Sequence, residues 1–164
     1  MTPHEPITYI GLGSNLGDRR RNLESALSAL RQTTGIELVA VSTLIETEPE
    51  GPPGQDRYLN GAATIRTKLS PRGLLHAMLE IESAHGRDRT VEGRWGPRRL
   101  DLDLLMYADR IIDEPELVVP HPRMHQRTFV LAPLAEIAPD AVHPVLGVTI
   151  RGLHERLITA KTAE

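Results

Sequence analysis

The sequence predicts an α+β fold in which helices cover a mainly antiparallel sheet, and three observations carry that prediction. Apolar runs typical of strands alternate with segments whose apolar residues recur at helical spacing. The connections between them are too short for a doubly wound parallel sheet. The composition, 40% hydrophobic and 25% charged over 164 residues, fits one folded domain spanning residues 1–164.

The first part of the chain follows a strand–helix–strand order. A short apolar run predicts a strand at 7–13. A helix is expected to open at Gly17-Asp18 and to end at Gly35. One helical face of this segment is apolar, and it comprises Leu23, Ala26, Leu27 and Leu30. A β-branched run predicts a second strand at 36–46, followed at 47–57 by a loop with three prolines and two glycines.

The next part repeats that order. Residues 58–67 predict a strand, and Ser70-Pro71 is a helix-start signal, an N-cap followed by proline at the first helical position. Gly86 is expected to stop this helix. A long, charged loop at 87–99 and a strand at 100–107 complete the second unit.

The remaining patterns add a hairpin and two short helices. Extended segments are expected at 110–113 and 116–121, and helices at 130–137 and 149–158. Two strand–helix–strand units with these additions favour a ferredoxin-like α-β sandwich. An open α/β sheet is the competing fold.

Two carboxylates on the last long strand form the clearest candidate site. Asp101 and Asp103 alternate with Leu100, Leu102 and Leu104, and alternate residues of a strand share a face. Both carboxylates therefore project together, with Cα atoms roughly 7 Å apart, while the leucines anchor the strand. Paired oxygen ligands suit Mg²⁺, and the pattern favours a phosphoryl-transfer site over a solvated strand face.

Arginines crowd the loop that precedes these carboxylates. They are punctuated by glycines, which permit a loop to fold over a ligand, and comprise Arg87, Arg89, Arg94, Arg98 and Arg99. Guanidinium groups match phosphate oxygens bidentately. The single tryptophan, Trp95, could stack on a heterocycle or cap the local core.

Three weaker signals remain open from the residues alone. The run at 11–17, G-L-G-S-N-L-G, is neither a dinucleotide fingerprint nor a Walker A loop and fits a tight strand-to-helix turn. Asn60 could read the edge of an amide-like heterocycle, but a backbone-bonded strand residue is the favoured interpretation. His121 could contact phosphate or cap a turn.

Composition excludes several classes of function. The chain has no cysteine, which excludes disulfides, thiolate catalysis and cysteine-ligated zinc. A net charge of -3 gives no general attraction to nucleic acid. The polar N-terminus lacks a signal core, and no segment approaches the roughly 20 apolar residues of a membrane span. We expect a cytoplasmic monomer that binds small molecules rather than membranes or nucleic acid.

The ordered motifs of the chain resemble those of the hydroxymethyl-dihydropterin pyrophosphokinase family of folate biosynthesis. In chain order they are G-L-G-S-N-L, E-T-E-P-E-G, Y-L-N, I-E-x-x-x-G-R, R-W-G-P-R-x-x-D-L-D-L-L, V-P-H-P-R-M and R-x-F-V-L-x-P-L-x-E-I-A-P. The resemblance spans nearly the whole chain. It implies a ferredoxin-like fold, two Mg²⁺ ions and transfer of the β,γ-pyrophosphoryl group of ATP to the pterin hydroxymethyl oxygen, with release of AMP.

The resemblance also implies roles for individual residues. Asp101 and Asp103 would hold the two metal ions and, with Arg87 and Arg98, serve catalysis. The ATP site would comprise Glu82, Arg89, Arg94, Trp95, Arg98, Leu104, His121 and Arg127. The pterin pocket would comprise Thr47, Tyr58, Asn60, Trp95 and Phe129, with Tyr58 and Phe129 sandwiching the ring.

Four positions depart from the family pattern and leave the adenine and ribose contacts open: Leu79, Glu116, Val118 and Pro122. A second hypothesis, from another class, is a regulatory or RNA-binding module on a ferredoxin-like sheet. RNA recognition needs a basic sheet with exposed aromatics, whereas this chain is slightly acidic and only 3% aromatic. The paired carboxylates beside an arginine-rich loop favour the enzyme.

Overall fold

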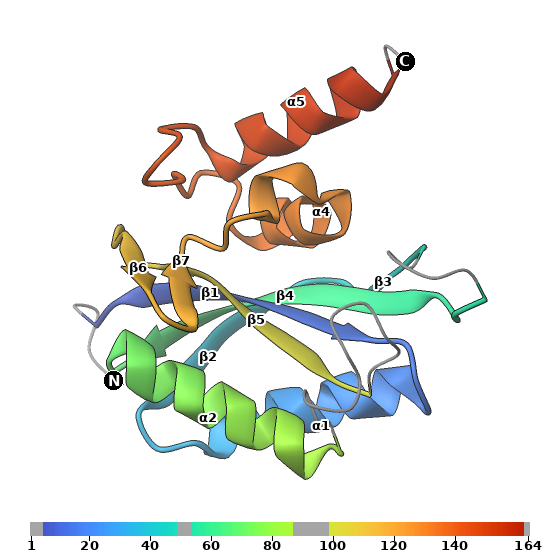
Figure 1. Ribbon diagram of the computed structural model, residues 1–164, viewed down its shortest axis with the longest axis vertical. Coiled ribbons are helices and arrows are strands. Elements are labelled where there is room, and N and C mark those ends of the chain that lie inside the picture. The colour runs from blue at the N-terminus through green and yellow to red at the C-terminus, as the bar shows by residue number, and fades with distance from the viewer. Residues whose placement is uncertain (1–4, 49–53, 87–98, 163–164) are drawn as a thin grey trace.

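The computed structural model describes residues 5–48, 54–86 and 99–162, which form layers of helix, sheet and helix (Figure 1). The strands are β1 (Ile7–Ser14), β2 (Ile36–Val41), β3 (Ile45–Thr47), β4 (Tyr58–Thr67), β5 (Asp101–Tyr107), β6 (Ile112–Glu114) and β7 (Leu117–Val119). The helices are α1 (Arg19–Gln32), α2 (Pro71–Ala84), α4 (Thr128–Ile137) and α5 (Ile150–Thr162), with a 3₁₀ turn, η1, at Met124–Gln126.

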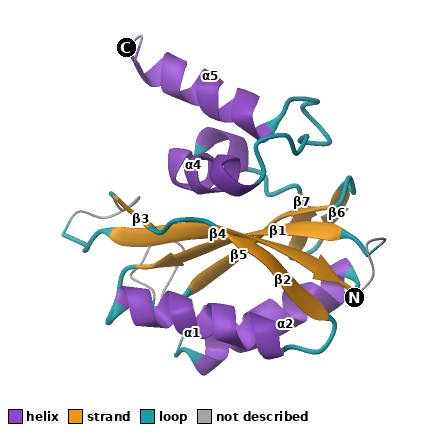
Figure 2. Cartoon of the chain, turned by 180° about the vertical axis from the view of Figure 1, so that it is seen from behind, coloured by secondary structure: helices purple, strands orange, loops and turns teal. Residues whose placement is uncertain are grey.

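The sheet confirms the ferredoxin-like, mainly antiparallel fold predicted from the sequence and adds its strand order. Its central order is β2-β4-β1-β5, every described pair is antiparallel, and the short β3 pairs with β4. The units β1-α1-β2 and β4-α2-β5 therefore interleave, and an open parallel sheet is excluded. Figure 2 shows α1 and α2 on one face of this sheet and α4 and α5 beyond the other.

Both long helices begin where their capping residues indicate. The Asp18 carboxylate accepts a hydrogen bond from the Arg21 N–H at 3.1 Å, and the Ser70 hydroxyl accepts one from the Gly73 N–H at 3.0 Å. After α1, Gly35 has φ +90°, a backbone conformation that glycine adopts without steric cost. Local sequence therefore sets the bounds of these helices.

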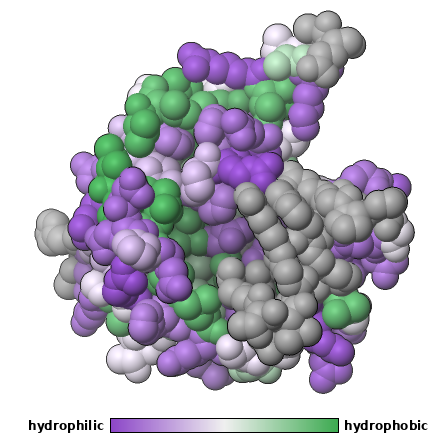
Figure 3. Space-filling model, viewed as in Figure 1, coloured by the Kyte–Doolittle hydropathy of each residue, from purple (hydrophilic) through white to green (hydrophobic). Residues whose placement is uncertain are grey.

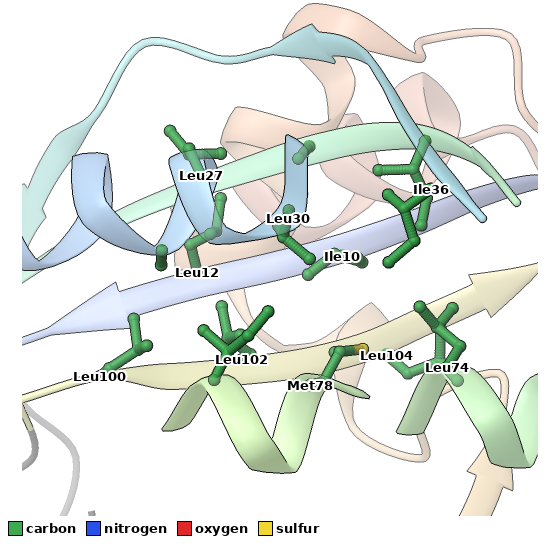
Figure 4. Close-up of a cluster of buried hydrophobic side chains, with 14 of the residues drawn as sticks. Ile10, Leu12, Leu27, Leu30, Ile36, Leu74, Met78, Leu100, Leu102 and Leu104 are labelled. Atoms are coloured by element: carbon green, nitrogen blue, oxygen red, sulfur yellow. The ribbon is translucent and has the colours of Figure 1, made fainter. Parts of the chain in front are cut away.

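Two apolar cores lie on opposite faces of the sheet. The first joins the sheet to α1 and α2, and Figure 4 shows Leu30 of α1 near Ile10 of β1 and Met78 of α2 near Leu102 of β5. The second joins the other face to η1, α4 and α5; its members include Leu105, Met106, Leu131 and Leu153. Because both faces are covered, the functional surface has to lie toward one end of the sheet.

A bulge in β5 interrupts the predicted alternation. Ile10 pairs with Leu104 and Tyr9 pairs with Met106, so Leu105 is an extra residue. Leu104 lies in the first core, while Leu105 and Met106 both lie in the second. The bulge comes after Asp101 and Asp103, so these two residues still share a face. Beyond it, Leu105 and Met106 both pack in the second core.

The strand predicted at 36–46 is two strands. The Ser42 N–H donates to the Ala62 carbonyl at 2.9 Å, and the Ser42 hydroxyl accepts from the Ala62 N–H at 2.8 Å. The chain then bends so that Leu44 lies over Gly61. A Cβ at Gly61 would come within 2.7 Å of the Leu44 side chain. A separate strand, β3, consequently begins at Ile45 and pairs with β4.

The outer layer keeps some apolar surface in contact with solvent. Val142, Val145 and Leu146, in the loop before α5, are exposed. Figure 3 shows hydrophobic surface on the corresponding upper part of the molecule. Among the described residues, every helix is too short or too polar to cross a membrane.

Candidate active site

Strand register brings the carboxylates and Asn60 into neighbouring rows on one face of the sheet. Gly13 pairs with Asp101 on one side and with Asn60 on the other. Since adjacent strands lie about 4.8 Å apart, the Asp101 and Asn60 backbones are about 10 Å apart across Gly13. The next row carries Asp103, Gly11 and Ala62 in the same manner. Small residues therefore form a floor between the carboxylates and the amide.

Gly13 is required in this floor because other side chains occupy the space above it. A Cβ there would lie 2.8 Å from the Asn60 Oδ1 atom and 3.5 Å from the Tyr58 ring. The strand predicted at 7–13, which includes Gly11 and Gly13, is confirmed, and β1 continues to Ser14. The strand-to-helix turn expected in the run at 11–17 follows the strand and begins at residue 15. Because Gly11 and Gly13 alternate with Ile10 and Leu12, the sequence indicates a strand that carries no side chains on one face at these positions.

The two aspartates project from the start of an edge strand. Both are partly buried, and Asp101 and Asp103 share the face opposite Leu102 and Leu104. The N–H of Leu102, between them, donates a 2.7 Å hydrogen bond to the buried Glu82 carboxylate. The backbone that carries the pair is thus held on its open edge by α2. Among the described residues, no group of three or more potential metal ligands forms, so a metal here would rely on these two carboxylates and on substrate.

His121 lies along the same edge of β5. Its backbone N–H donates to the Leu105 carbonyl at 2.8 Å, and its Nδ1 accepts from the Arg123 N–H at 3.2 Å. Burial, and then the charge of Arg127, lower the pKa of His121 to about 4; Asp101 opposes that shift and Arg123 adds to it. The imidazole is therefore neutral at pH 7, with the proton on Nε2 available as a donor.

The predicted pterin residues of β3 and β4 form one group. Thr47 pairs with Tyr58, and the Asn60 side-chain amide donates to the Thr47 hydroxyl. Because Ile45 pairs with Asn60, all four side chains leave the same face of the sheet. From the residues alone, the favoured interpretation was that the Asn60 side chain bonds its own backbone. In the structure this buried side chain instead makes a hydrogen bond to another strand.

A cavity of about 360 Å³ lies between β3 and the start of α4. Thr47 and Phe129 line it together with Arg127, and Lys161 reaches it from α5. The Arg127 guanidinium carbon is 5.4 Å from the centre of the Phe129 ring. The Lys161 ammonium donates to the Thr128 hydroxyl at 2.6 Å, which ties the end of α5 to the first residue of α4. One predicted ATP residue and two predicted pterin residues thus border one opening.

Two predicted ATP residues lie on the other side of β5. Leu104 packs in the first core, and Glu82 is buried between α2 and β5. Their assignment to the ATP site stays a prediction. Five predicted site residues lie outside the described part of the chain: Arg87, Arg89, Arg94, Trp95 and Arg98.

Comparison with known proteins identifies the family. The model of the family 7,8-dihydro-6-hydroxymethylpterin-pyrophosphokinase (HPPK) matches residues 9–139. The 2-amino-4-hydroxy-6-hydroxymethyldihydropteridine pyrophosphokinase of Synechocystis sp. is 47% identical, with 96% of this chain and 83% of the relative covered. The Bacillus subtilis protein of the same name is 48% identical, with 80% of this chain and 77% of the relative covered.

Solved structures agree in fold. A chain described as Plasmodium falciparum HPPK-DHPS, wild type with pteroate, matches all of this chain with a TM-score of 0.79 at 14% identity. A further HPPK-DHPS structure in complex with substrates gives a TM-score of 0.76 at 12% identity. This chain spans less than half of each, 46% and 45%, and such low identity speaks for the fold alone. With the family match over residues 9–139 and the close relatives, the chain belongs to the 7,8-dihydro-6-hydroxymethylpterin-pyrophosphokinase family.

Proposed function

We propose that this member of the family transfers the β,γ-pyrophosphoryl group of ATP to the hydroxymethyl oxygen of 6-hydroxymethyl-7,8-dihydropterin and releases AMP, as a step of folate biosynthesis. The observation that carries the proposal is the row Asp101–Gly13–Asn60, in which an amide and a carboxylate flank a strand position without a side chain. The relatives' names supply the pterin substrate class.

The pterin is proposed to bind at the Asn60 end of that row. Its pyrimidine ring is flat and amide-like, so the Asn60 side chain can pair with its edge while Tyr58 and Phe129 contact its faces. Thr47 supports Asn60 through the hydrogen bond between their side chains. Trp95 is proposed to complete the pocket. This placement directs the hydroxymethyl group toward β5.

The triphosphate is proposed to bind at the carboxylate end. Asp101 and Asp103 fit Mg²⁺ because they are oxygen ligands that share one strand face. Two Mg²⁺ ions held there, when bound, would neutralise charge on the transferred group. The Leu102 hydrogen bond to Glu82 keeps the strand that bears both carboxylates in place.

Cationic and neutral donors are proposed to surround the phosphates. His121 donates from Nε2 as a neutral imidazole, and Arg127 supplies a fixed positive charge on the same side. Arg87, Arg89, Arg94 and Arg98 are proposed, on the resemblance, to close over the triphosphate and exclude water. Much of the rate acceleration would then come from alignment of the pterin oxygen with the β-phosphorus.

The alternative of an RNA-binding sheet receives no support from the fold. Such a sheet binds RNA on an open face with exposed aromatics. Here α4 packs on the face opposite α1 and α2 and buries Ala62, Leu105 and Met106 there.

The test is pterin-dependent AMP formation by the wild type and by Asp101→Asn and Asp103→Asn. Asp109→Asn is the matched control, since Asp109 is exposed in the turn that follows the same strand. Each site variant is expected to lose AMP formation by a factor of about 10³ or more, while the control keeps wild-type activity. Activity within tenfold of wild type in either site variant would remove the metal-ligand assignment.

Arg98 provides a second check on the triphosphate end. Arg98→Ala is expected to lower kcat more than pterin affinity, because the proposed contacts of Arg98 are to phosphate. An effect confined to pterin binding would contradict that placement.

A further inference from the structure

Arg19, the first residue of α1, contacts two segments that are distant in sequence. Its Nη1 donates to the Arg57 carbonyl at 2.9 Å, and its Nη2 donates to the Glu46 Oε1 at 2.5 Å. Glu46 lies on β3, and Arg57 directly precedes β4. One side chain therefore joins the helix to both strands that carry the proposed pterin residues.

Apart from the contacts of Glu46, β3 is held by the hydrogen bond from the Asn60 amide to the Thr47 hydroxyl and, just before the strand, by those from Thr43 to the Glu136 carboxylate. It is three residues long, lies at the edge of the sheet and pairs with β4 at three positions. Side chains alternate along it, so Ile45 and Thr47 face the cavity while Glu46 leaves the opposite face toward Arg19. A contact on Glu46 thus fixes the strand without entering the space in which Thr47 acts.

The segment before β4 is held from the same side. Arg57 lies 3.0 Å from the Glu48 carboxylate and 4.0 Å from the second oxygen of Glu46. The buried Asn15 side chain donates to the Asp56 carbonyl at 3.2 Å. These contacts set the position at which the chain enters β4 at Tyr58.

The charges at this junction are complementary. The hydrogen bond from Arg19 is the main cause that lowers the pKa of the Glu46 carboxyl, followed by the charges of Arg19 and Arg57. Glu46 is accordingly ionised at neutral pH and pairs with two guanidinium groups. Because these groups are partly exposed, their attraction is sensitive to salt.

We propose that Arg19 is a positioning residue for the pterin site: by joining Glu46 of β3 to the backbone before β4, it keeps Thr47 opposite Tyr58. The proposal rests on the proposed function, since it assumes that Thr47, Tyr58 and Asn60 receive the pterin. Arg19 itself touches no substrate. Without the Arg19 side chain, β3 and the residues directly before β4 can shift together. This shift would misplace the pterin pocket rather than the phosphate site.

The test compares steady-state kinetics of Arg19→Ala with those of Arg20→Ala, the exposed neighbour on the same helix. For Arg19→Ala, we expect the KM for the pterin to rise about five- to tenfold, with kcat and the KM for ATP within about twofold of wild type. Arg20→Ala is expected to leave all three parameters unchanged. An unchanged pterin KM in Arg19→Ala, or an equal loss in kcat and ATP affinity, would overturn the proposal.

A double-mutant cycle separates positioning through the ion pair from general destabilisation. Glu46→Ala removes the carboxylate that Arg19 contacts. If this contact positions the pocket, Arg19→Ala should raise the pterin KM by a smaller factor in the Glu46→Ala background than in the wild type. If the two factors are equal, the ion pair does not position the pocket.

Equilibrium dialysis of the pterin, with Mg²⁺ and a non-hydrolysable ATP analogue, makes the result independent of turnover. Weaker pterin binding by Arg19→Ala supports the positioning role even if the wild type forms no AMP. Equal binding by the variant and the wild type overturns it even if the proposed reaction is confirmed.

Discussion

The pH dependence of stability offers a quantitative test of the environment of His121. Burial and the neighbouring Arg127 lower its pKa to about 4, against 6.5 for an ordinary histidine. Between those values the unfolded chain binds a proton that the folded protein excludes. The contribution of His121 to the free energy of unfolding is therefore fully present above pH 6.5 and is lost as the pH falls from 6.5 toward 4.

The size of this effect follows from the two pKa values. The full difference corresponds to about 3 kcal/mol of unfolding free energy, of which about 2 kcal/mol is lost by pH 5. His121→Asn removes the titrating ring while its side-chain oxygen can still accept from the Arg123 N–H.

The assay is urea unfolding of the wild type and His121→Asn at pH 8 and pH 5. The wild type is expected to lose about 2 kcal/mol more than the variant between the two pH values. Packing lost in the variant is the same at both pH values and cancels in this comparison, as does titration of other groups. Identical pH dependence in the two proteins would refute the argument that the folded site excludes the proton.

Three further substitutions test the fold and the floor of the site. Gly13→Ala places a Cβ 2.8 Å from the Asn60 Oδ1. We therefore expect the pterin KM, measured by AMP formation, to rise roughly tenfold or more. An unchanged pterin KM would contradict the requirement for a glycine beside Asn60. Ser70→Ala removes the acceptor for the Gly73 N–H and should cost about 1 kcal/mol in urea unfolding, and no loss would mean that this cap is dispensable. Leu30→Ala empties a fully buried position between α1 and the sheet and should cost about 2–5 kcal/mol; a loss below 1 kcal/mol would show that the core collapses around it.

Local sequence patterns predicted the elements of this fold well because each is encoded by neighbouring residues. The caps at Asp18 and Ser70 set the helix starts, and the alternation around Asp101 and Asp103 set their shared face. The bulge at Leu105 escaped prediction because period-two alternation assumes an unbroken strand, and the extra residue is visible only in the pairing with β1.

The arrangement of the site depends on register, which local patterns do not give. The strand predicted at 7–13 included Gly13, but only the pairing of β1 places this residue between Asp101 and Asn60. The Arg19–Glu46 contact joins residues 27 positions apart, and neither residue stands out among the other charges of the chain. The family resemblance contributed predicted roles that the residues alone left open, such as pterin binding by Asn60.

The fate of the β-phosphate of ATP tests the central claim most directly. The purified protein would be incubated with Mg²⁺ and ATP labelled at the β-phosphorus, with and without 6-hydroxymethyl-7,8-dihydropterin. Pyrophosphoryl transfer predicts AMP only when the pterin is present, with the β-label recovered on the pterin in equal amount. Label retained in ADP, or AMP formed at the same rate without pterin, would contradict it.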